Sequence, residues 1–247
     1  MSQKGYVIVT GASRGIGAAT VLQMAKEGFD VVGTYIHEGS EGKIQKVMEQ
    51  ARAYGVTAEY CRCDTSKYED CAKLFAFAEE KLGRNLAAMI ANAGIAGAAF
   101  FNEEPRESYE NMIQTNLLGP MYCTQLALSY MIPNKKGHIV LLSSIGGTMG
   151  VPTQVAYGAA KGGLISFAKA LSKEVAPHNV LVNCVAPGVI DTDMVANAPA
   201  AQREATNATI PLGRMGVAQD IADCISYLVN SNYVTGQTIS PNGGIYA

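Results

Sequence analysis

The sequence predicts an α/β protein built on a doubly wound, seven-stranded parallel sheet with helices on both faces. Two observations carry this prediction. Short apolar runs alternate along the chain with segments long enough for helices, which is the pattern of repeated strand–helix–strand units. The runs are also continuously apolar (VIV, MIA and IVLL), as expected for strands that are buried on both faces.

The expected elements follow one another in a simple order. We expect strands at 6–10, 30–35, 58–63, 87–91, 138–142, 180–185 and around Thr238. The segments between them include predicted helices at 14–28, 42–54, 67–82 and 157–175. Because parallel neighbours need long crossover connections, this alternation favours parallel over antiparallel pairing.

The chain of 247 residues is predicted to form one domain, 1–247, because no linker, charge block or internal repeat divides the sequence. Residues 191–216 interrupt the alternation with Pro199, a set of small residues and Gly213. We expect this segment to form a mobile lid over the substrate, since loops that rigid elements position often carry binding functions.

The composition excludes several classes of partner. Nineteen Lys and Arg residues stand against 21 Asp and Glu residues, so no net positive field favours nucleic acid or an anionic membrane. The sequence has no signal-peptide pattern and no run of ~18 apolar residues, and we therefore expect a cytoplasmic protein. Charged residues make up 16% of the chain, below the ~25% that is typical, which favours a homo-oligomer with buried subunit contacts.

The cysteines and histidines do not have the spacing of a metal site. The single C-R-C pair at 61–63 lacks the second half of a zinc site, and the three histidines are far apart in the sequence. We therefore predict neither a metal nor a disulfide framework.

The first apolar run leads directly into TGASRGIG, residues 10–17, and then into a helical pattern. Gly11 suits a tight turn, Gly15 lets the backbone approach a pyrophosphate, and Gly17 permits close packing of the helix. The N–H groups at the helix start would face the phosphates. Such glycines can also form an ordinary turn, but their place between the first strand and a helix favours a Rossmann-type dinucleotide site.

A tyrosine and a lysine, Tyr157 and Lys161, stand four residues apart in a predicted helix. Positions i and i+4 share one face of a helix, so the ammonium could lower the pKa of the phenol and make it an acid/base group. Ser144 follows the fifth strand, at the edge where open α/β sheets bind ligands. Such a pair alone is commonly a surface contact, but the serine and the phosphate loop favour a catalytic site.

Taken together, these elements resemble the short-chain dehydrogenase/reductase family over essentially the whole chain. The elements that carry the resemblance are TGASRGIG at 10–17, Asp64, Asn92-Ala93-Gly94, Asn116, Ser144, Tyr157 with Lys161, and Pro187-Gly188. The resemblance implies a nicotinamide-dependent oxidoreductase that forms a homotetramer. The subunit contacts would come from the helix at 162–170 and from the C-terminal strand with its NGGIYA tail.

The resemblance also implies a role for each catalytic residue. Hydride would pass from the nicotinamide to a ketone carbon while Tyr157 donates a proton to the oxygen, which Ser144 would hold. Lys161 would bind the nicotinamide ribose and lower the pKa of Tyr157. Asn116 would hold a water of a proton relay, although a helix residue of this type can instead bond the backbone.

The resemblance implies that the cofactor contacts residues from six segments of the chain. The implied set is Gly11, Ala12, Ser13, Arg14, Gly15, Ile16, Gly17, Tyr35, Asp64, Thr65, Asn92, Ala93, Gly94, Tyr157, Lys161, Pro187, Gly188, Ile190 and Thr192. Within it, Asp64 would contact the adenine edge, and Ile190 and Thr192 would contact the carboxamide. Asp64 could also cap the helix at 67–82, and the two roles are compatible.

We expect NADPH to be preferred over NADH. An acidic residue after the second strand would bond the adenosine ribose 2′-OH and repel a 2′-phosphate. Here Tyr35 stands where the NAD users of the family tend to carry aspartate, and the first acid is Glu38. Arg14 supplies a permanently charged fork that suits a phosphate, and His37 could add a contact if protonated.

The closest resemblance within the family is to the 3-oxoacyl-(acyl carrier protein) reductases of fatty-acid synthesis, through VAPGVIDTDM at 185–194 and the ending NGGIYA. This implies reduction of a 3-oxoacyl thioester carried by acyl carrier protein or CoA. Lys135 and His178 stand where those enzymes have basic residues that face the carrier. The alternatives are another secondary alcohol or ketone, such as a hydroxysteroid or sugar, and a dinucleotide sensor without turnover.

Overall fold

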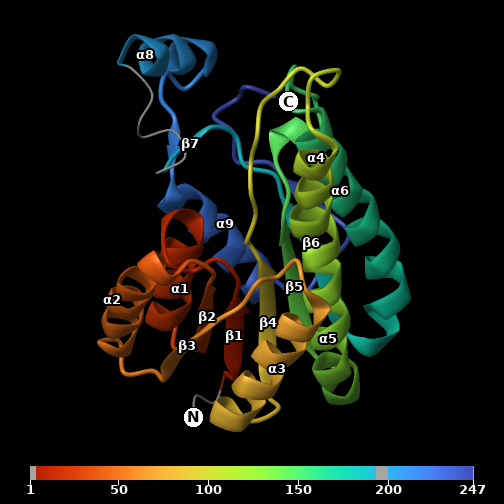
Figure 1. Ribbon diagram of the computed structural model, residues 1–247. Helices are drawn as coiled ribbons and strands as arrows, with labels where there is room; N and C mark the ends of the chain where they lie inside the picture. The colour runs from red at the N-terminus through yellow and green to blue at the C-terminus, as the bar shows by residue number, and fades with distance from the viewer. Residues whose placement is uncertain (1–3, 193–199, 247) are drawn as a thin grey trace.

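The computed structural model describes residues 4–192 and 200–246, and its central feature is the predicted parallel sheet of seven strands (Figure 1). The order of the strands across the sheet is β3-β2-β1-β4-β5-β6-β9. Their bounds are β1 (Tyr6–Val9), β2 (Asp30–Tyr35), β3 (Ala58–Arg62), β4 (Leu86–Ala91), β5 (Gly137–Leu142), β6 (Val180–Val185) and β9 (Thr238–Ile239). The chain order reverses between β1 and β4, the point where sheets of this type leave a crevice for ligands.

Helices cover both faces of the sheet, as the sequence predicts. On one face lie α1 (Gly15–Lys26), α2 (Glu41–Arg52) and α9 (Ala218–Asn230). On the other lie α3 (Tyr68–Leu82), α5 (Gly119–Asn134) and α6 (Val155–Val175). The helix α4 (Arg106–Ile113) runs through a π-helical turn (Gln114–Leu118) into α5. Short single turns lie at Glu38–Ser40, Ile145–Gly147 and Ala176–His178.

The segment after β6 contains a second, smaller sheet that the sequence analysis does not predict. The short strands β7 (Ile190–Asp191) and β8 (Gly216–Val217) pair in parallel, and α8 (Ala200–Thr209) lies between them in the chain. The Arg203 guanidinium donates to both oxygens of Asp191, at 3.0 and 2.6 Å, and so joins α8 to β7. Residues 193–199 of the predicted lid lie outside the described residues.

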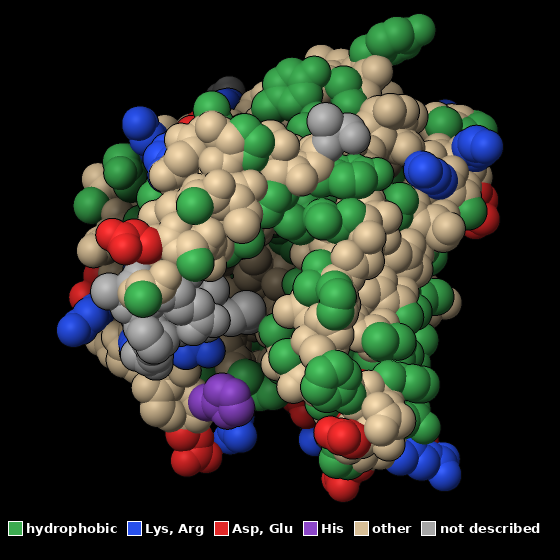
Figure 2. Space-filling model, turned by 90° about the horizontal axis from the view of Figure 1, so that it is seen from above, with side chains coloured by type: hydrophobic (Ala, Val, Ile, Leu, Met, Phe, Trp, Pro, Cys, Tyr) green, Lys and Arg blue, Asp and Glu red, His purple; other side chains and the backbone are tan. Residues whose placement is uncertain are grey.

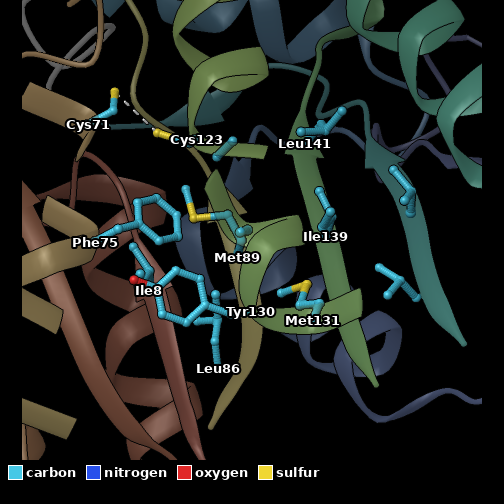
Figure 3. Close-up of a cluster of buried hydrophobic side chains, with 14 of the residues drawn as sticks. Ile8, Cys71, Phe75, Leu86, Met89, Cys123, Tyr130, Met131, Ile139 and Leu141 are labelled. Carbon is cyan, nitrogen blue, oxygen red and sulfur yellow. Dashed lines mark hydrogen bonds between the residues drawn. The ribbon is translucent and has the colours of Figure 1, made fainter. Parts of the chain in front are cut away.

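Two apolar layers hold the helices on the sheet, and Figure 3 shows part of the layer beneath α3 and α5. There the rings of Phe75 and Tyr130 lie 5.8 Å apart, next to Met89. The six cysteines are free thiols. Among the described residues, no helix is long and apolar enough to cross a membrane.

The packing around Phe75 predicts a large loss of stability on truncation. Phe75 is 2% exposed, and removing its ring leaves a cavity between α3 and the sheet. We expect Phe75→Ala to lower the free energy of unfolding by about 3–5 kcal/mol, measured by urea denaturation. The matched control is Phe100→Ala, because Phe100 is 66% exposed and should change stability by about 0.5 kcal/mol or less. Equal effects of the two substitutions would contradict this account of the core.

Candidate active site

The predicted site residues gather at one edge of the sheet, because the carboxyl ends of parallel strands lie together. Seen from above, this edge carries a hollow that hydrophobic side chains border in part (Figure 2). The ends of β1 to β6 and the loops that follow them, together with the π-helical turn and α6, supply the residues that are described below. This is where ligands bind in open parallel sheets.

The glycine-rich loop after β1 is fixed from two neighbouring strands. From β2, the backbone oxygen of Thr34 accepts from the Ala12 N–H at 2.8 Å, and its side-chain oxygen accepts from the Gly11 N–H at 3.1 Å. From the loop after β4, Asn92 Nδ2 donates to the carbonyls of Thr10 and Gly11 at 2.9 and 3.1 Å. The loop is therefore held in place before any ligand arrives.

Three glycines of this loop have the conformations or contacts that the sequence predicts. Gly11 and Gly15 have φ values of +66° and +56°, which favour glycine. A Cβ at Gly17 would lie 2.2 Å from the Gly11 carbonyl oxygen, so α1 packs directly on the loop. A Cβ at Gly15 would lie 3.5 Å from Thr192 Cγ2, which places that predicted carboxamide contact over the loop.

The loop after β6 is held from both sides of the site. The Pro187 carbonyl accepts from the Ile145 N–H at 3.0 Å, and the Gly188 N–H donates to the Pro241 carbonyl at 3.0 Å. A Cβ at Gly188 would lie 2.7 Å from the Asn242 Cα atom. The C-terminal segment therefore packs on the loop that the resemblance assigns to the nicotinamide.

At the other end of the crevice, Tyr35 is the last residue of β2, and Asp64 follows β3. Burial raises the pKa of the Tyr35 phenol, and its hydrogen bond to Glu41 raises the pKa further. The alternative role for Asp64, capping the following helix, is wrong. The helix α3 begins at Tyr68, and Asp64 Oδ1 instead accepts from the N–H and hydroxyl of Ser66, at 3.1 and 2.6 Å.

Thr65, the next predicted cofactor contact, is buried against the start of α5. It is 6% exposed, and a Cβ at Gly119 would lie 2.6 Å from the Thr65 carbonyl oxygen.

For Asp64, burial acts to raise the pKa, but hydrogen bonds from Ser66 and Lys67 outweigh it and lower the pKa. The carboxylate is therefore ionised at neutral pH and can accept hydrogen bonds from a ligand.

A buried ammonium occupies the centre of the site. Lys161 on α6 is 4% exposed, and its Nζ atom donates to the Leu142 carbonyl at the end of β5 at 2.6 Å. A Cβ at Gly94 would lie 3.5 Å from the same Nζ atom. Burial lowers the pKa of Lys161 to about 8, because the charged form loses its hydration.

Tyr157 lies one helical turn before Lys161, and the ammonium nitrogen is 5.8 Å from the centre of its ring. The expectation that Lys161 lowers the pKa of Tyr157 is not met in this structure. Burial raises the pKa of Tyr157, against a smaller lowering by its hydrogen bond with the Ser144 hydroxyl. The Ser144 oxygen also accepts from the Gly146 N–H at 3.1 Å, so serine, glycine and tyrosine form one cluster.

Asn116 lies in the π-helical turn between α4 and α5 and is fully buried. Its Oδ1 atom accepts from the Ile95 N–H at 2.9 Å, and its Nδ2 atom donates to the Ile95 carbonyl at 2.7 Å. The backbone-bonding alternative for Asn116 is therefore confirmed for its side chain. A Cβ at Gly94 would lie 2.7 Å from Asn116 Oδ1, so glycine lets this loop pass close to Lys161.

The structure thus brings most of the predicted site residues to the edge formed by the carboxyl ends of the strands. The two residues expected to face a carrier protein lie elsewhere. Lys135 and His178 precede β5 and β6, so they lie at the opposite edge of the sheet. The sequence analysis missed the contributions of Gly146 and of the Leu142 carbonyl. A glycine two residues after Ser144 was an available signal for the first, whereas a backbone carbonyl has no signature in the sequence.

The arrangement fits a dinucleotide. The loop of positive-φ glycines leads into α1, whose first N–H groups are the usual partners of a pyrophosphate. The crevice continues past Gly94 to Lys161 and Tyr157, which can donate to ribose hydroxyls and to a reacting oxygen. Among the described residues no group of histidine, cysteine or acidic side chains could hold a metal ion.

The buried ammonium predicts a specific dependence of stability on pH. The pKa of Lys161 is about 8 in the folded protein and 10.5 in its ordinary state, so the cost of burying the charge is present below pH about 8 and vanishes above 10.5. Relative to Lys161→Met, the wild type should gain up to about 3 kcal/mol of unfolding free energy as pH rises across this window. Urea unfolding of both proteins at several pH values measures the gain, and a constant difference would contradict it.

Comparison with known proteins agrees with this site. The model of the family described as short chain dehydrogenase matches residues 5–203. The 3-oxoacyl-[acyl-carrier-protein] reductase FabG of Pseudomonas aeruginosa is 38% identical over 249 residues, 100% of this chain and 99% of the relative. The FabG protein of Staphylococcus aureus is 35% identical over 97% of each chain. That of Staphylococcus epidermidis is 35% identical over 97% of this chain and 98% of its own.

The matched segment contains the phosphate loop, the loop after β4 and the cluster around Tyr157. It therefore includes all the residues that carry the resemblance to this family in the sequence, from the phosphate loop at 10–17 to Pro187-Gly188. Membership implies an oxidoreductase that uses a nicotinamide dinucleotide. The chain belongs to the short-chain dehydrogenase family.

Proposed function

We propose that this protein reduces a 3-oxoacyl thioester to the 3-hydroxyacyl thioester, with NADPH as the reductant. The observation that carries the proposal is the cluster of Ser144 and Tyr157 beside the buried Lys161 ammonium, at the edge of the sheet where the phosphate loop also lies. The 3-oxoacyl thioester comes from the names of the relatives, which are 35–38% identical over nearly the whole chain.

In this mechanism Tyr157 is the proton donor. Burial raises the pKa of its phenol, so the group is protonated at neutral pH and ready to donate. The bound cofactor supplies the hydride that ends on the ketone carbon. The phenolic proton passes to the ketone oxygen, and Ser144 donates a hydrogen bond to the same oxygen as its negative charge develops.

Lys161 supports the same step without contacting the ketone. Its ammonium lies 5.8 Å from the centre of the Tyr157 ring and donates to the Leu142 carbonyl, so it helps to hold α6, and Tyr157 with it, against the sheet. Its other role is to donate to the ribose hydroxyls of the cofactor. Asn116 fixes the loop after β4 through its two bonds to Ile95, and this keeps Gly94 against the ammonium.

Removing the phenolic hydroxyl tests the assignment of the proton donor. Tyr157→Phe keeps the ring but not the acid, so the rate of NADPH oxidation with an acetoacetyl thioester should fall by ~10²-fold or more. Cofactor binding should be retained. Tyr233→Phe is the matched control, because Tyr233 is fully exposed. Near-full activity of Tyr157→Phe would rule out this role, and a faster reaction with steroid or sugar ketones would rule out the thioester.

The preference for NADPH depends on Arg14, which precedes α1. A charged hydrogen bond to the 2′-phosphate contributes ~1.5–3 kcal/mol, or roughly 10–150-fold in affinity. We expect kcat/KM to be higher with NADPH than with NADH for one ketone, and Arg14→Ala and Tyr35→Asp to reduce the ratio. Equal efficiency of the two cofactors in the parent protein would contradict the proposal.

We also propose a homotetramer that uses α6 and the C-terminal tail. Ile165 and Phe167 on α6 are only partly buried within one chain, although both are large and apolar. Covering such side chains with a second copy removes them from water. Light scattering should therefore give a mass about four times 26.0 kDa, and a stable monomer at micromolar concentration would contradict this assembly.

A further inference from the structure

Arg62 is a cation at the adenosine end of the crevice that the sequence analysis did not single out. It is the last residue of β3 and pairs in register with Tyr35, the last residue of β2. Its Nε atom donates to the Ile36 carbonyl at 2.9 Å, and its Nη1 atom donates to Glu38 Oε1 at 3.2 Å. The guanidinium is therefore held against the segment that directly follows β2.

This segment lies beside the phosphate loop. Thr34 accepts from both Gly11 and Ala12, and a Cβ at Gly33 would lie 2.9 Å from Ala12 Cβ. A ribose that continues from a pyrophosphate on this loop meets the residues after β2. A free carboxylate at this position favours a ribose 2′-hydroxyl and repels a 2′-phosphate.

Two carboxylates follow β2, and both are engaged by neighbours. Glu41 accepts a hydrogen bond from the Tyr35 phenol. Glu38 forms an ion pair with Arg62, in which the side chains are 85% and 59% exposed. Arg62 uses two of the five N–H donors of a guanidinium in the two bonds given above, and its exposed fork can donate to a further anion.

We propose that Arg62 is a second specificity-determining residue for the 2′-phosphate, acting together with Arg14. It neutralises Glu38, the first acid after β2, and it donates to the phosphate directly. This inference rests on the proposed use of NADPH. It explains how a chain with glutamate three residues after Tyr35 can still accept a phosphorylated ribose.

The binding of two small nucleotides tests the proposal without any turnover. Isothermal titration should show that the wild type binds 2′,5′-ADP more tightly than 5′-AMP, because only the first carries the 2′-phosphate. Arg62→Ala should weaken 2′,5′-ADP by roughly 10-fold or more and should not weaken 5′-AMP, whose 2′-hydroxyl a freed Glu38 can still accept from. Arg62→Lys keeps the charge but loses the fork, so its affinity for 2′,5′-ADP should lie between those of the wild type and Arg62→Ala. Arg106→Ala is the matched control, since Arg106 pairs with Glu110 on α4.

The double variant separates the two actions of Arg62. If the guanidinium only neutralised the acid, Glu38→Gln would fully restore 2′,5′-ADP binding to Arg62→Ala. The proposal expects incomplete restoration, because the direct contact to the phosphate is still missing. Full restoration would overturn the direct contact.

The remaining outcomes distinguish this inference from the proposed function. An Arg62→Ala protein with the wild-type preference for 2′,5′-ADP overturns the role of Arg62 and leaves the use of NADPH standing. Equal loss of both nucleotides also overturns it, because Arg62 would then only support the segment after β2. A wild type that binds both nucleotides equally overturns the use of NADPH and this inference together. Thermal unfolding of each variant checks that it is folded.

Discussion

The buried ammonium of Lys161 is the constraint on which the rest of the site depends. A charged group without water needs partners, and here the Leu142 carbonyl at the end of β5 accepts from it at 2.6 Å. The same turn of α6 is tied to the sheet by Ser143, whose hydroxyl donates to the Lys161 carbonyl at 2.8 Å. Because α6 is fixed at this point, Tyr157 one turn earlier is fixed as well. Gly94 lies against the ammonium from the loop after β4, and the bonds of Asn116 to Ile95 hold that loop in place.

Burial also decides which protonation states the site prefers. It raises the pKa of Tyr157 and lowers that of Lys161 to about 8. The neutral form of each side chain is therefore more favoured in the site than it would be in water. A neutral phenol suits proton donation, and an ammonium that is still charged at neutral pH can donate hydrogen bonds to ribose hydroxyls. The two shifts have one cause, the low polarity of the crevice, and together they prepare the chain for reduction of a carbonyl.

Much of the fold could be predicted from the sequence, because continuous apolar runs and glycine positions report directly on strands and turns. The seven strands, the phosphate loop and the i,i+4 relation of Tyr157 and Lys161 follow from such local patterns. The errors concern partners that local patterns do not specify. Asp64 bonds Ser66 rather than the helix α3, and burial rather than Lys161 dominates the pKa of Tyr157. The small β7–β8 sheet was missed because two-residue strands carry no periodic signal.

The most direct test of this account is the pH dependence of kcat/KM for NADPH during ketone reduction, because this ratio reports the ionisations of the free enzyme. The account predicts a constant value at neutral pH and a decline as pH rises through about 8, where Lys161 loses its proton. A value that stays constant to about pH 10, where an unperturbed lysine would begin to titrate, would contradict the central role of the buried ammonium.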